Sequence, residues 1–152
     1  MAKYSIDGQD TNTAATTILQ FNSDATRPRR AKVAYLTLGS DATPADNAAE
    51  YNLQRFTVVG ATTTAVTPRP LDPADAATEM DAHEASNIEP TYTADLVMLN
   101  FMANQRATFQ WYAAPGYEIV VPATASNGLG LLSVTVAGSA VNTGCTIHFE
   151  EQ

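Results

Sequence analysis

Hydrophobic and polar residues alternate along short segments of this chain, and Gly, Pro, Asn and Asp stand between the segments. A period of two residues is typical of β-strands, because successive side chains point to opposite faces of a sheet. Segment 31–38 shows the pattern best, with Val33 and Tyr35 expected on one face and Leu36 and Leu38 on the other. The pattern therefore predicts strands rather than amphipathic helices.

Similar segments run through the chain and predict an all-β protein. The expected strands lie within 3–6, 15–21, 31–38, 51–59, 63–67, 95–102, 106–112, 118–121, 131–137 and 145–150. Short strands with turns about every 8–12 residues, without helices between them, are typical of a β-sandwich or jelly roll. We therefore predict one domain over 1–152, a β-sandwich that is jelly-roll-like. The polar segment 1–13 is expected to serve as a flexible N-terminal arm.

The segment from Leu71 to Glu89 interrupts the strand pattern. Pro68 and Pro70 precede it, and proline cannot donate a hydrogen bond to a sheet. Asp72 is a good helix N-cap and Pro73 a good first helical residue. We expect a long loop that crosses between the two sheets and contains at most a short helix.

Charge and composition narrow the classes of partner. The formal net charge is −8, which argues against general nucleic-acid binding because phosphate recognition needs a basic surface. Charged residues make up 16% of the chain, compared with about 25% in typical domains. A sparsely charged surface suits a protein that packs against neighbours, and a merely neutral polar surface is the alternative interpretation. The apolar runs are shorter than the roughly 18 residues of a membrane span, and the N-terminus has no apolar core of a signal peptide.

The sequence contains no residue set that predicts catalysis. His83 and His148 are the two histidines, and Cys145 is the single cysteine. Cys145 and His148 are three residues apart in one expected strand, so their side chains point to opposite faces and do not form a dyad. The chain also has none of the common nucleophile, phosphate-loop or zinc motifs. We therefore predict a protein that is not an enzyme and uses no cofactor, with Cys145 as a buried structural thiol.

Two segments of opposite charge are candidates for contacts with partners. Half of the basic residues lie in one turn, and six acidic residues lie in the long loop. The basic residues are Arg27, Arg29, Arg30 and Lys32, and the acidic ones are Asp72, Asp75, Glu79, Asp81, Glu84 and Glu89. One interpretation is a local anion contact, with nucleic acid or with an acidic neighbour. Another is that the basic turn of one copy meets the acidic loop of the next copy. A solubilising turn that protects a strand edge is the alternative.

The acidic segment has a second interpretation, a Ca²⁺ site built from converging carboxylates. Its spacing does not follow an EF-hand loop, and no glycine in 72–89 supplies the sharp turn of such a loop. A solvated loop, or one that meets a basic partner, is favoured, with Asp72, Asp75 and Glu79 as its candidate contact residues. No metal site is predicted.

The loop from Asn127 to Gly130 and three aromatic residues are further candidates. Asn127 and Gly128 are predicted interaction residues, since glycine lets a neighbouring backbone approach closely. Trp111 and Tyr112 are adjacent in an expected strand, so one faces inward and the other outward. With Tyr117 they suggest an alternative function, a carbohydrate-binding β-sandwich whose aromatic rings stack on sugars. A core tryptophan with a tyrosine at an interface is the favoured interpretation.

Several segments resemble small virion proteins of tailed bacteriophages. They are Tyr51–Thr57, Thr64–Asp75, Glu89–Thr93, Asn104–Trp111 and Ala114–Pro122 with the 127–130 loop. The resemblance covers most of the chain, from about residue 30 to the end, and defines no binding residues. It implies a structural protein, either a capsid decoration (cement) protein or a tail or neck component.

A decoration protein binds the outside of the phage head and stabilises contacts between major capsid subunits. The resemblance therefore implies two partners, the major capsid protein and other copies of this chain in a dimer or trimer. It also implies a location on the capsid surface of the virion after synthesis in the host cytoplasm. No membrane or general nucleic-acid partner is expected.

Overall fold

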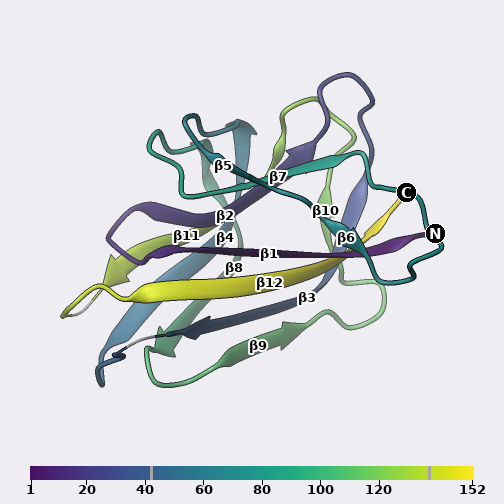
Figure 1. Ribbon diagram of the computed structural model, residues 1–152. Coiled ribbons are helices and arrows are strands. Elements are labelled where there is room, and N and C mark those ends of the chain that lie inside the picture. The colour runs from purple at the N-terminus through teal and green to yellow at the C-terminus, as the bar shows by residue number, and fades with distance from the viewer. Residues whose placement is uncertain (42, 137) are drawn as a thin grey trace.

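The computed structural model describes residues 1–41, 43–136 and 138–152, and these residues form twelve strands and no helix. The strands are β1 (Lys3–Thr11), β2 (Thr16–Ser23), β3 (Ala31–Ser40), β4 (Ala48–Val58), β5 (Thr64–Val66), β6 (Arg69–Pro70), β7 (Met80–Glu84), β8 (Thr91–Asn104), β9 (Phe109–Tyr112), β10 (Ile119–Val121), β11 (Gly128–Val136) and β12 (Asn142–Glu151). Figure 1 shows them in two layers. The all-β prediction is confirmed.

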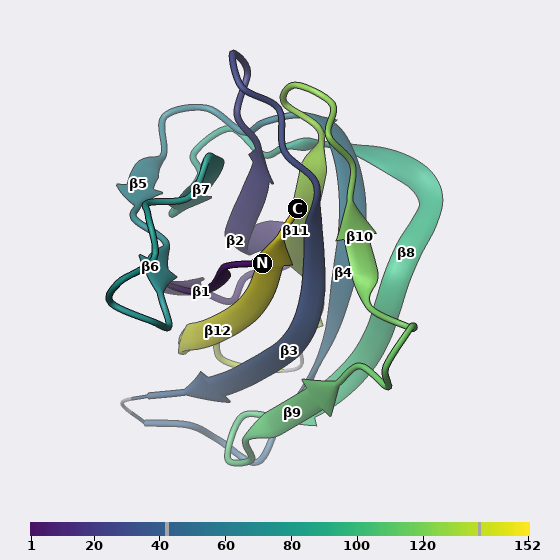
Figure 2. The same ribbon diagram turned by 90° about the vertical axis from the view of Figure 1, so that its right-hand side faces the viewer.

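The strands form two antiparallel sheets that pack face to face. Sheet A has the order β10–β3–β12–β1–β6, and β9 also pairs with β3. Sheet B has the order β5–β7–β2–β11–β4–β8. In Figure 2, β5–β7 lie at one side of the sandwich and β8–β10 at the other. The predicted β-sandwich is confirmed, and the finer jelly-roll description stays a prediction.

Alternation along the strands places the core between the sheets. In β12 every second residue is buried, from Thr143 to Phe149, and the residues between them face outward. The Phe149 ring lies 5.4 Å from the ring of Tyr4 in β1 and 5.7 Å from that of Phe21 in β2. Because β2 belongs to the opposite sheet, Phe149 links the two layers. Burial of such aromatic rings is a main source of stability in a sandwich of this kind.

A β-bulge in β3 corrects the predicted facing of that strand. Tyr35 pairs with His148 and Val33 with Phe149. His148 and Phe149 are adjacent in β12, but their partners in β3 have one extra residue between them. The inserted residue shifts the alternation, and Val33, Leu36 and Leu38 are all buried. The prediction of Val33 and Leu36 on opposite faces was therefore wrong, and Tyr35 is left on the outer face of sheet A.

The N-terminal segment is not a free arm in the structure. β1 lies between β12 and β6 in sheet A and pairs with β12 from Lys3 to Thr11. Tyr4 and Ile6 point into the core, which fixes the segment that was expected to be flexible. Its polar residues occupy the outward positions of a half-buried strand, and this alternation explains why the segment looked like an arm.

The long interruption crosses between the sheets as predicted, because β6 belongs to sheet A and β7 to sheet B. No helix forms after Pro73. Instead, the Asp72 side chain accepts a hydrogen bond from the Ala74 backbone N–H at 2.9 Å, which closes a tight turn. The sequence did not predict β6 and β7. It placed 128–130 in a loop, whereas these residues begin β11. Ala137, the last residue of the predicted strand 131–137, lies outside the described residues.

Candidate interaction surfaces

The charged turn, the acidic segment and the Asn127 loop meet at one end of the sandwich. The Arg27 guanidinium forms an ion pair with Glu79 at 2.8 Å. The Ser23 N–H donates to the Asn127 carbonyl, and the Ser126 N–H donates to the Ser23 carbonyl, both at 3.2 Å. Three segments that are distant in sequence therefore form one surface, which we call the loop end.

Local hydrogen bonds shape the turn after β2. The Asp24 carboxylate accepts bonds from the Thr26 hydroxyl and from the backbone N–H groups of Thr26 and Arg27 at 2.6–2.8 Å. These bonds stabilise the ionised carboxylate and lower the pKa of Asp24. The turn is thus held in shape by its own residues.

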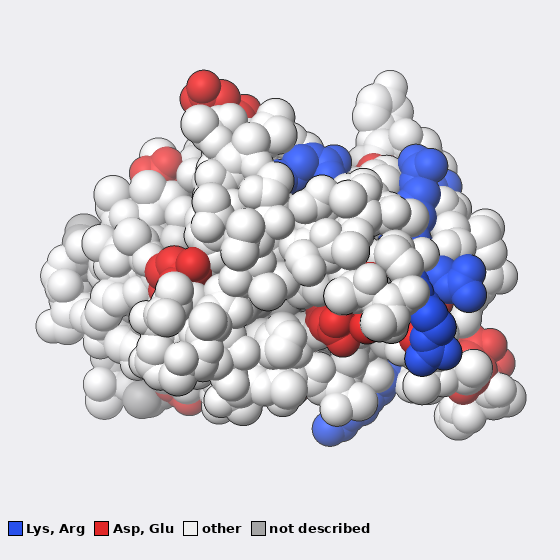
Figure 3. Space-filling view, turned by 90° about the horizontal axis from the view of Figure 1, so that it is seen from above, with Lys and Arg blue, Asp and Glu red and all other residues white. Residues whose placement is uncertain are grey.

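One ion pair joins the basic turn to the acidic segment within the same chain, and the predicted contact between copies stays a prediction. Arg27 and Glu79 satisfy each other, while Arg29 and Arg30 remain exposed. In Figure 3 the Lys and Arg side chains gather toward the side of the molecule that carries both termini in Figure 1. All three arginines of the turn are therefore exposed, and Arg27 also makes an ion pair within the chain.

The C-terminus ties the acidic segment to sheet A. The Thr78 hydroxyl and the Glu79 N–H donate to the Glu151 carboxylate, the latter at 2.9 Å. The Gln152 N–H donates to the Arg30 carbonyl at 2.8 Å. Asp72 and Asp75 lie further along the loop, where Asp75 N–H closes the turn onto the Asp72 carbonyl at 3.0 Å.

Gly128 and Lys32 lie apart from the exposed part of the loop end. Gly128 is buried in β11, and a Cβ atom there would lie 2.2 Å from the Phe21 carbonyl oxygen and 2.5 Å from the Phe56 ring. The close approach expected of this glycine is present, but its neighbours are strands of the same chain. Lys32 lies in β3 and borders a hollow on sheet A.

The described residues contain no cluster of three or more His, Cys, Asp or Glu with the geometry of a metal site. Cys145 is buried in the core, and burial raises the pKa of its thiol. His148 is on the outer face of sheet A, so the two side chains point in opposite directions, as predicted. Partial burial lowers the pKa of His148.

Strand β8 is a surface that the sequence analysis did not identify. In the described part of the chain it is the last strand of sheet B and pairs with β4 alone. Gln54 pairs with Val97 and Phe56 with Tyr92, so one residue of β4 lies opposite four of β8, and 93–96 form a bulge. Leu96 is 40% exposed and Met102 71% exposed. The edge is therefore long, partly apolar and unpaired on one side.

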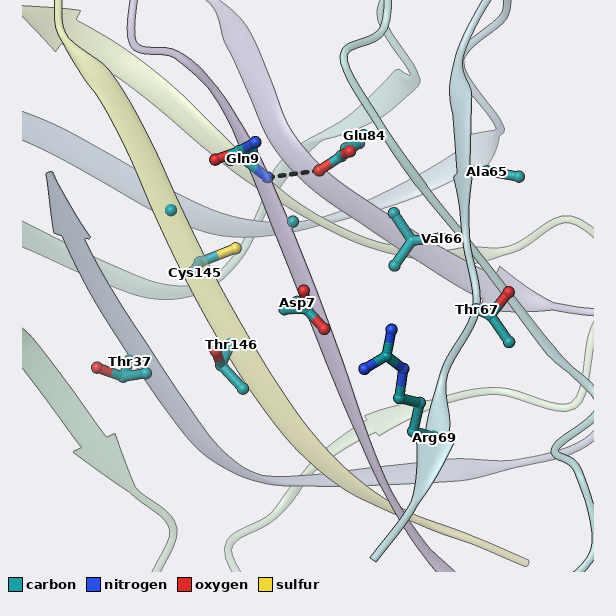
Figure 4. Close-up of a pocket in the computed structure, with 12 residues that line it drawn as sticks. Asp7, Gln9, Thr37, Ala65, Val66, Thr67, Arg69, Glu84, Cys145 and Thr146 are labelled. Atoms are coloured by element: carbon teal, nitrogen blue, oxygen red, sulfur yellow. Dashed lines mark hydrogen bonds between the residues drawn. The ribbon is translucent and has the colours of Figure 1, made fainter. Parts of the chain in front are cut away.

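Two hollows lie on the outer face of sheet A. The larger, about 600 Å³, is lined by polar side chains from β1, β3 and β12, and by the segment from Ala65 to Arg69 and Glu84 (Figure 4). The smaller, about 350 Å³, contains Tyr35, Tyr112 and His148. The inward Trp111 and the outward Tyr112 follow the predicted alternation, and Tyr117 is exposed but does not line either hollow.

Tyr35 and His148 were not predicted as surface residues of interest. Tyr35 was assigned to the face of Val33, and only the bulge at this point of β3 places it outward. The alternation of apolar and polar residues in β12 could have indicated that His148 faces outward.

The chain matches no protein-family model, and no curated protein or solved structure is significantly similar to it. The residues that the structure describes form no helix that is long and apolar enough to cross a membrane.

Proposed function

We propose that this chain is a structural virion protein, a capsid decoration protein that binds the outside of a phage head and other copies of itself. The observation that carries the proposal is the open edge of β8. An exposed strand edge with apolar side chains is a template for pairing with another chain, and proteins that stay monomeric usually protect it with charge or proline. The part of β8 after its bulge, from Val97 to Asn104, contains no charged residue and no proline, whereas Asp95 lies within the bulge.

The charge distribution supports association at this edge. The chain carries a net charge of −8, so two copies repel each other over much of their surface. An antiparallel pair of β8 strands brings together the neutral segment from 97 to 104 of each copy, while Leu96 lies beside Asn127 of the loop end. Such pairing across a two-fold axis also covers the same apolar patch on both copies.

The strand order supports a jelly roll, which we infer as the finer description of the fold. Eight strands give the orders β1–β12–β3–β9 in one sheet and β2–β11–β4–β8 in the other, and the chain changes sheet at nearly every step. The short strands β5–β7 are an insertion before β8. Jelly rolls occur in viral capsid domains and in lectins, so this argument is an analogy of fold.

The first test is the solution mass by light scattering over a range of concentrations. We expect a dimer for the wild type, since pairing across a two-fold axis joins two copies, and a monomer for Met102→Lys, because a lysine on the edge opposes pairing. Ile88→Lys is the matched control, since Ile88 is 61% exposed and lies outside β8. A wild-type monomer at all concentrations, or equal effects of both variants, would contradict assembly through β8.

The second test is co-sedimentation with undecorated heads of the phage that encodes the chain. Decoration predicts saturable binding to heads, and the double variant Arg29→Glu, Arg30→Glu should weaken it because both arginines are exposed. Unchanged binding would exclude the basic turn as a contact. Absence of binding to heads would overturn the decoration role. Imaging of the protein at the tail or neck would replace that role by the alternative structural one.

A further inference from the structure

We propose that the outer face of sheet A binds a neutral oligosaccharide, with Tyr35, Tyr112 and His148 as the stacking subsite. This inference does not rest on the proposed role in assembly, because it uses a different sheet and a different set of residues.

The three aromatic side chains form a row across neighbouring strands. Tyr35 in β3 pairs with Tyr112 in β9 and with His148 in β12. The Tyr35 ring centroid lies 4.7 Å from that of Tyr112 and 4.9 Å from that of His148, with the rings tilted by 38° and 48°. Tyr112 is 65% exposed. Cross-strand pairing accounts for the contacts between the rings, but not for the hollow beside them.

The hollow has the size and lining of a small-molecule site. Its volume of about 350 Å³ falls in the range of about 300–1,000 Å³ that is usual for ligand pockets. Leu71 adds an apolar side chain at its border. Aromatic faces with a few polar groups around them are well suited to a sugar ring, which has both apolar C–H faces and hydroxyl groups.

The charges at this hollow balance each other and favour a neutral ligand. Lys3 and Lys32 supply two positive charges, and Glu118 and Glu150 supply two negative charges. Ammonium groups donate to hydroxyl oxygens, and carboxylates accept from hydroxyl hydrogens, so a polyhydroxyl compound satisfies both. A phosphate, a sulfated sugar or a cation would pair with one set and be repelled by the other.

The larger hollow extends the site along the same strands. Thr37 lies two residues after Tyr35 in β3, and Thr146 lies two residues before His148 in β12. Both threonines are therefore on the same face as the aromatic rings, about 7 Å further along the sheet. Figure 4 shows Asp7, Thr37 and Thr146 on the sheet and Arg69 on the segment facing them. Hydroxyl, carboxylate and guanidinium groups continue the hydrogen-bonding surface. The continuous face therefore favours a chain of several sugar units over a single ring.

The test is isothermal titration calorimetry of the full chain with three neutral probes, namely maltohexaose, cellohexaose and chitohexaose. Heparin hexasaccharide serves as the anionic probe. We expect saturable binding of at least one neutral probe, with a dissociation constant that Tyr112→Ala weakens at least tenfold. Calorimetry is chosen because the one tryptophan, Trp111, packs against the core and not against the hollow.

Tyr117→Ala is the matched control, because Tyr117 is 81% exposed and lies outside both hollows. It should bind as the wild type does. Tyr112→Phe keeps the ring and should retain binding, and thermal melts of each variant show whether the fold is intact. Absence of binding to all neutral probes, binding of heparin alone, or equal losses for the Tyr112 and Tyr117 variants would overturn the proposal.

Discussion

The replacement Gly128→Ala tests whether this residue belongs to the core or to an interaction surface. Gly128 pairs with Asn22 of β2 and with Phe56 of β4, so it lies in the middle of sheet B. An added Cβ would lie 2.2 Å from the Phe21 carbonyl oxygen, a backbone atom held by the sheet. The strand must therefore move, because no rotation of a side chain relieves this contact.

The cost follows from overpacking of a close-packed interior. Inserting a methyl group into such a site typically costs about 1–3 kcal/mol, and a backbone clash belongs to the upper part of that range. We expect Gly128→Ala to lower the free energy of unfolding by about 3 kcal/mol. For a domain of this size, that loss corresponds to a fall in Tm of about 6–12 °C.

Gly39→Ala provides the control on the same chemical change. The nearest atom to a Cβ at position 39 is the Thr108 hydroxyl oxygen at 3.7 Å, an ordinary contact. Its stability should change by less than about 1 kcal/mol, because the loss of glycine flexibility in the unfolded chain offsets small strains. Urea and thermal unfolding, followed by circular dichroism, measure both variants. A Gly128→Ala protein that melts within about 2 °C of the wild type would refute this reasoning.

Three further predictions concern the loop end, the buried thiol and the outer face of sheet A. Arg27→Ala should reduce the free energy of unfolding by less than about 1 kcal/mol, because Arg27 is 69% exposed in its ion pair with Glu79, and 1 M NaCl should remove most of the difference. Cys145 should react with a thiol reagent at pH 8 only in denaturant, since burial both shields the thiol and raises its pKa; fast reaction of the native protein would be inconsistent with the structure. Burial lowers the pKa of His148, so below about pH 6.5 the unfolded chain takes up this proton more readily than the folded one. Stability should therefore fall as the pH drops from 7.5 to 5.5, and by a smaller amount in His148→Gln; equal falls in Tm would contradict this assignment.

Alternation along the chain was enough to predict an all-β protein with two layers, although it missed β6 and β7. A period of two residues with one apolar face requires a second sheet to cover that face, and this local property is legible without coordinates. The same adjacency rule put Trp111 and Tyr112 on opposite faces of their strand. It also separated Cys145 from His148, because neighbours three apart in a regular strand face opposite ways.

Tertiary structure decided which strands pair and which surfaces remain. β1 appeared as a polar arm because its outward residues are polar, and only its pairing with β12 and β6 shows that Tyr4 and Ile6 are buried. The sequence showed that Arg27 and Glu79 carry opposite charges, but contact within one chain depends on the path of the 51 positions between them.

The bulge in β3 also depends on tertiary structure, because it is defined by the pairing register of β3 with β12. Its one extra residue reverses which face all later side chains of β3 point to. That register placed Tyr35 beside Tyr112 and His148 on the outer face of sheet A. Alternation is a property of one strand, whereas register and edge position are properties of its neighbours. For this reason the sequence predicted the sandwich, and the tertiary structure decided where its candidate sites lie.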